Sequence, residues 1–104
     1  MPKHLAGLEE LVLLAVASLS DAYGVTVQER IESETRSRVS IGAVYTVLDR
    51  LERRGYVRSW LGEATAARGG RRKRLFRATA QGLSALREMD RIRASLLSPS
   101  PRTA

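Results

Sequence analysis

The feature that most constrains the fold is a run of apolar residues at helical spacing. This run ends at a glycine and is followed directly by residues that alternate with the period of two typical of a strand. The apolar residues of this run stand at i, i+3, i+4, i+7 and i+10 after Ser40, and they are Ile41, Val44, Tyr45, Leu48 and Leu51. Ser40 is a favourable N-cap and Gly55 a favourable left-handed stop, so we expect a helix between them. The alternation from Tyr56 to Gly62 then predicts a strand.

Two further helices are predicted upstream. Apolar residues at helical spacing from Leu8 to Leu19 indicate a helix with a wide buried face. A turn follows at residues 20–24, and after it comes a second helix. Thr26 and Glu29 match a capping box for its start, but Asp21 is an alternative cap for an earlier start.

The second half of the chain predicts a hairpin and a closing helix. The segment Lys73–Ala78 reads as a strand, and Glu63–Arg72 joins the two strands by a basic loop with a mobile tip. Thr79 is a favourable cap for the last helix. The order ααα-ββ-α predicts a mainly α fold with a small β-hairpin, the winged helix-turn-helix, over residues 1–79.

We expect residues 80–97 to form a dimerisation helix within the same compact unit, and residues 98–104 to form a disordered tail. One stripe of the helix is apolar, and it consists of Leu83, Leu86, Met89, Ile92 and Leu96. Because so small a domain cannot bury the whole stripe, we expect it to pair with a second copy, together with Leu8. Packing within one subunit is the alternative.

The positive charge is concentrated in one part of the chain. The segment from Arg50 to Arg77 contains ten basic and two acidic residues, a net charge of +8. Because the whole chain has a net charge of +7, the rest of the chain has a net charge of −1. Such a local field favours a polyanion, most commonly nucleic acid. An anionic membrane surface is the alternative, but the cations do not lie opposite a free apolar helix face.

Several classes of site lack their usual residues. With no cysteine and a single histidine, His4, neither a metal centre nor a cofactor is expected. The apolar run Leu11–Ala17 is far shorter than the roughly 20 residues that span a bilayer, so we expect a cytoplasmic protein without a membrane partner. Four carboxylates are expected on helical surfaces, where nothing tunes them for catalysis; they are Glu9, Glu10, Glu29 and Glu32. An enzyme is therefore not expected.

Four stretches of the chain carry a resemblance to a known family. They are LEELVLLA at residues 8–15, AYG at 22–24, SIGAVYTVLDRLERRGYV at 40–57 and RGGRRKRLFRATAQG at 68–82. Together they resemble the PadR family of bacterial transcriptional regulators, and specifically its short subgroup with a single C-terminal helix. The resemblance covers most of residues 5–95 and implies a homodimeric repressor that binds double-stranded DNA at an inverted repeat.

The chain departs from this family at a few positions. Leu75 and Phe76 stand where two aromatic residues are frequent, and Ala78 stands where an aliphatic residue is frequent. These positions lie in the second predicted strand and leave the expected function unchanged. Longer members of the family carry an extended C-terminal dimerisation region, whereas this chain resembles the short subgroup.

The predicted DNA contacts begin on the helix after Ser40. Its groove-facing residues are expected to be Ser40, Gly42, Ala43, Thr46 and Arg50. The small residues let the backbone approach DNA, and Thr46 and Arg50 reach base edges or phosphates. Tyr45 has two open roles, core packing or a phosphate contact. Tyr23 has the same two, the DNA-facing one being implied by the resemblance.

The basic hairpin is the second predicted DNA contact. Its cations are Arg68, Arg71, Arg72, Lys73 and Arg74. Arginine binds phosphate in a bidentate manner and enters narrow minor grooves. Trp60 on the first strand is either packed in the core or dimer, or stacks on a small-molecule effector, which the sequence does not identify.

Two other functions compete with a DNA-binding regulator. One is a dimeric basic adaptor that binds an acidic protein partner without sequence-specific DNA recognition. The other is RNA binding, which is disfavoured because the aromatic residues Tyr56, Trp60 and Phe76 all fall on strands expected to be packed.

The charge pattern predicts the salt dependence of DNA binding. If the five hairpin cations meet phosphates, log K should fall against log salt concentration with a slope of about −4 to −5 per subunit. Titration of a labelled duplex at several salt concentrations measures this slope. A flat dependence would contradict the electrostatic contact.

Overall fold

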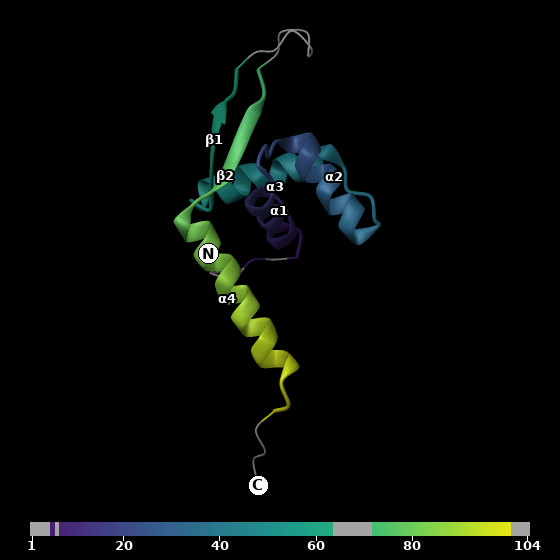
Figure 1. Cartoon of the computed structure of the whole chain (residues 1–104), viewed down its shortest axis with the longest axis vertical. Helices are drawn as coiled ribbons and strands as arrows, with labels where there is room; N and C mark the ends of the chain where they lie inside the picture. Colours follow the sequence, from purple (N-terminus) through teal and green to yellow (C-terminus); the bar gives the residue numbers. More distant parts are fainter. Residues whose placement is uncertain (1–4, 6, 64–71, 101–104) are drawn as a thin grey trace.

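The computed structural model describes residue 5 and residues 7–63 and 72–100. Its elements are α1 (Gly7–Ser18), α2 (Gly24–Thr35), α3 (Ile41–Arg53), β1 (Val57–Leu61), β2 (Arg74–Ala78) and α4 (Ala80–Leu97). This is the predicted order ααα-ββ-α, and the two strands form an antiparallel hairpin. The hairpin and α4 project from opposite ends of the body formed by the first three helices (Figure 1).

The core lies where α1, α2, α3 and the hairpin meet. Its largest fully buried side chains are Leu13, Leu48, Leu51, Val12, Val27 and Val44. Two predicted core residues were wrong, because Leu11 is 39% exposed and Ile41 is 38% exposed. The continuous apolar run of α1 offers apolar side chains on every face, so spacing alone does not select the buried one.

The start of α2 differs from both predicted starts. Tyr23 is the N-cap and the helix begins at Gly24. Thr26 stands three residues after the N-cap, at position N3. Its hydroxyl accepts a hydrogen bond from the Tyr23 backbone at 3.0 Å and donates one to the Asp21 carbonyl at 2.8 Å. The threonine therefore does cap the helix, but from the N3 position rather than from the N-cap.

The caps of the next helices are confirmed. The Ser40 hydroxyl accepts from the backbone of Ala43 at 3.1 Å, and the Thr79 hydroxyl accepts from the backbone of Gly82 at 3.0 Å. After α3 the chain reverses at Gly55, whose φ of 81° is the left-handed conformation that glycine adopts without strain.

The hairpin is attached to the helical body along β2. In its register Trp60 pairs with Leu75, and Ser59 pairs with Phe76. The outer edge of β2 is also bonded, because the backbone of Phe76 donates to the carbonyl of Ala22 at 2.8 Å. Phe76 itself is buried in the core, so the base of the wing is fixed to the loop that precedes α2.

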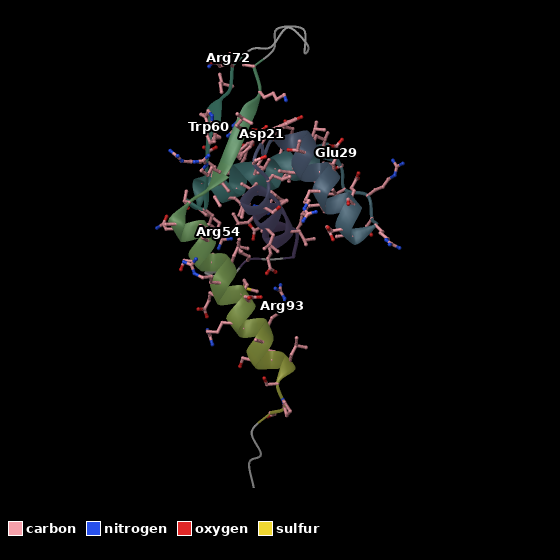
Figure 2. All side chains as sticks on the ribbon, viewed as in Figure 1. Asp21, Glu29, Arg54, Trp60, Arg72 and Arg93 are labelled. Carbon is pink, nitrogen blue, oxygen red and sulfur yellow. The ribbon has the colours of Figure 1, made fainter. Side chains whose placement is uncertain are left out.

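Two adjacent carboxylates tie α1 to its neighbours, which corrects the expectation that they lie on a helical surface. Glu9 and Glu10 are each only 6% exposed. Glu9 pairs with Arg54 at 3.2 Å, and both side chains are 8% exposed. Glu10 pairs with Arg93 of α4, labelled in Figure 2. The hydrogen bond with Glu10, and then its charge, raise the pKa of the Arg93 guanidinium above its ordinary value.

The buried pair predicts an unequal response to two similar substitutions. Glu9→Gln leaves the buried Arg54 charge without its anion and should lower the free energy of unfolding by about 3 kcal/mol. The matched control Glu34→Gln breaks an exposed pair with Arg30 and should change the free energy of unfolding by less than about 0.5 kcal/mol. Urea unfolding measures both, and equal small losses would contradict the importance of the pair.

Candidate nucleic-acid interface

The exposed face of α3 carries most of the residues predicted to face DNA. Ser40, Gly42 and Thr46 are exposed, and Ala43 is half-buried. A Cβ added at Gly42 would meet nothing within 4 Å, so the backbone there is open to a close approach. Arg50 is 46% exposed at the side of this face, 3.8 Å from Glu9.

The two arginines at the end of α3 point in different directions. Arg54 is turned inward to Glu9, and its guanidinium lies 4.8 Å from the Tyr56 ring centroid. Arg53, by contrast, is exposed and lies on the same face as Gly42 and Thr46. Arg53 was missing from the predicted set, although its spacing of seven residues from Thr46 could have found it.

Five of the predicted residues meet at the loop end of the two wing strands. Here seven residues line a hollow of about 480 Å³, which we call the wing hollow; they are Tyr23, Val25, Tyr45, Leu61, Arg72, Lys73 and Arg74. They come from α2 and the loop before it, from α3, and from both ends of the hairpin connection. The hollow therefore joins cations of the wing to α3.

Both tyrosines of the wing hollow make specific packing contacts. The Lys73 ammonium lies 4.0 Å from the Tyr23 ring centroid. The Tyr45 ring lies against Gly24, and the side chain of Tyr45 is still 38% exposed. The structure thus supports packing for both residues, and it leaves the phosphate contact of each as a prediction.

The wing arginines differ in how much they are held by the protein. Arg72 donates to the carbonyls of Gly62 at 2.8 Å and Leu61 at 3.2 Å, at the end of the hairpin remote from α4 (Figure 2). Arg74 is held more strongly, by ion pairs with Asp49 at 3.1 Å and with Glu52. The other two predicted wing cations, Arg68 and Arg71, lie outside the described residues.

Trp60 lies outside the core. It is 41% exposed, and the guanidinium carbons of Arg58 and Arg77 lie 5.9 and 5.8 Å from its ring. It borders a hollow of about 520 Å³, whose lining includes Val16 and Leu83. Core packing is thereby ruled out for this side chain in the described subunit, and stacking on an effector stays a prediction.

The apolar stripe of α4 is divided between the subunit's own core and solvent. Leu86 and Met89 pack against the core, as does Leu8 of α1. Ile92 is half-buried, Leu83 is 39% exposed and Leu96 is 80% exposed. Packing within one subunit therefore accounts for the middle of the stripe and not for its end.

Fold and surface together define a winged-helix regulator of the DNA-binding type. The sequence model of the Transcriptional regulator PadR-like family matches residues 13–88, and the chain belongs to this family. Members are transcriptional regulators, which confirms the expectation of a regulator rather than an enzyme. No curated protein sequence matches the chain.

Solved structures show the same fold. A PadR-like transcription factor from Bacteroides fragilis is 25% identical with a TM-score of 0.74, and the match covers 86% of this chain and 82% of that one. A PadR family regulator from Eggerthella lenta is 24% identical with a TM-score of 0.70, over 86% and 73% of the two chains. PadR of Bacillus subtilis, solved with operator DNA, is 16% identical with a TM-score of 0.67, over 93% and 53%.

Among the described residues, no helix is both long and apolar enough to cross a membrane. The same residues hold no group of three or more histidine, cysteine or carboxylate side chains arranged to bind a metal ion.

The contact between Gly24 and Tyr45 predicts a non-additive pair of substitutions. A Cβ at Gly24 would lie 2.3 Å from Cζ of Tyr45, so Gly24→Ala should cost about 1–3 kcal/mol of unfolding free energy. In a Tyr45→Ala background the same substitution should cost less than about 0.5 kcal/mol, because the ring is gone. Urea unfolding of the four proteins tests this, and an equal cost in both backgrounds would contradict it.

Proposed function

We propose that this chain is a sequence-specific DNA-binding regulator that represses transcription as a homodimer on an inverted repeat. The observation that carries the proposal is the wing hollow, where cations of the wing meet α3, the helix that we propose reads DNA. In this proposal α3 enters the major groove, and the wing contacts phosphates or the minor groove. The complex of Bacillus subtilis PadR with operator DNA supports it as a precedent for the fold.

The arrangement of exposed groups supports contact with DNA in particular. Gly42 and Thr46 leave the start of α3 narrow enough for a groove, and Arg53 lies about two turns beyond Thr46 on the same face. Arg72 and Lys73 lie at the loop end of the wing strands, in the hollow that they share with Tyr45 of α3. Small residues flanked by cations match the shape and the charge of a duplex.

A homodimer is supported by apolar surface that the subunit leaves in solvent. Leu96 and Leu97 at the end of α4 are 80% and 84% exposed, and α4 extends beyond the body of the domain (Figure 1). On α1, Leu11 and Leu14 are 39% and 44% exposed on one face. Pairing of such surfaces removes apolar area from water, and two-fold symmetry places two recognition helices about 34 Å apart.

Selection of DNA fragments by the purified protein, followed by sequencing, tests this function. Wild-type protein should enrich one inverted repeat. Leu96→Arg should remove the second half-site from the enriched sequence, because a charge at the dimer surface separates the subunits. The matched control Ala94→Arg adds the same charge at an exposed position on the opposite side of α4 and should retain the full repeat.

Two results would count against the proposal. Enrichment of random fragments, with binding abolished by competitor DNA, would favour the basic adaptor that binds an acidic protein. Enrichment of a full repeat by Leu96→Arg would contradict dimerisation through α4.

A further inference from the structure

One acidic side chain lies in the middle of the face that we propose enters DNA. Gly42, Thr46, Asp49 and Arg53 are separated by four, three and four residues, so they form one stripe along α3, and all four are exposed. The stripe is opposite the buried residues, which are Val44, Val47, Leu48 and Leu51. Asp49 itself is 52% exposed.

A carboxylate on a polyanion-binding surface repels phosphates unless a cation compensates it. Arg74 supplies that cation, since its Nη1 lies 3.1 Å from Oδ1 of Asp49. Within the described residues Oδ2 of Asp49 accepts no hydrogen bond. One oxygen is therefore held by the protein and the other is left to accept a further donor.

Arg74 is held in place by other contacts and so orients the carboxylate. Its Nη2 pairs with Glu52, its Nε donates to the hydroxyl of Ser59 at 3.1 Å, and its guanidinium lies 4.9 Å from the Phe76 ring centroid. Because these partners belong to α3 and to both strands, the position of Asp49 is set by the junction of wing and helix. A carboxylate fixed in this way loses little rotamer freedom when it binds.

We propose that Asp49 is a specificity-determining residue, whose carboxylate accepts a hydrogen bond from a base amino group in the major groove. The bases that present such a donor there are cytosine, through N4, and adenine, through N6. This inference rests on the proposed function and extends it by assigning one base contact to an acidic residue. Judged by its charge alone, that residue would be excluded from a DNA-binding surface. Arg74 is then a positioning residue for base recognition.

The test measures base preference and non-specific affinity separately, by selection from a random library and by titration of a random-sequence duplex. Asp49→Ala should abolish the preference for cytosine or adenine at one position of each half-site, a loss of discrimination of about fivefold or more. Its affinity for random duplex should stay the same or rise, because a negative charge is removed. Asp49→Asn, which keeps the shape and an acceptor oxygen, should remain folded and favour adenine at that position.

Glu34→Ala is the matched control, because it removes an exposed carboxylate that pairs with Arg30 on α2, away from the stripe and from Arg74. It should retain the preference at that base pair. Unchanged preferences in Asp49→Ala, or an equal loss of affinity on every sequence, would overturn the role of Asp49 and leave the proposed function intact. A wild-type protein that selects no sequence would overturn both.

Discussion

The buried carboxylates of α1 are the constraint on which the rest of the structure depends. Glu9 and Glu10 are adjacent, yet they reach in different directions, to Arg54 after α3 and to Arg93 of α4. Adjacent helical residues point about 100° apart, so one turn of α1 holds two neighbours in place. Because a buried charge is costly without its partner, α1 links the orientation of the recognition helix to that of the C-terminal helix.

A second network sets the wing against the recognition helix. Arg74 connects β2 to Asp49 and Glu52 of α3, while Lys73 lies on the ring of Tyr23. The wing is thus positioned by ionic and aromatic contacts on the side of the proposed DNA surface and by Phe76 on the side of the core. An angle between wing and α3 that is fixed before binding reduces the ordering cost of engaging a duplex.

The sequence was most informative where the controlling interaction is local. Ser40, Thr79 and Gly55 marked element ends correctly, because a cap or a left-handed turn depends on atoms within a few residues. The start of α2 was missed, since Thr26 caps from N3 and Tyr23 is an uncommon N-cap. For the candidate site, the exposure of Gly42 and Thr46 followed from helical spacing, whereas the pairing of Arg54 with Glu9 did not.

By itself the sequence determined the order of helices and strands, the caps of α3 and α4, and the concentration of cations at α3 and the wing. Only the tertiary structure decided which charged side chains turn inward. Arg53 and Arg54 are neighbours of equal charge, but among the described residues only Arg54 of the two meets a carboxylate, one that lies 45 residues away in the chain. Arg74 likewise finds its anions on α3, 22 and 25 residues away. The spacing of residues shows which side chains share a face of a helix. The packing of segments that are distant in the sequence decides which of the charged side chains are buried and need a partner of opposite charge.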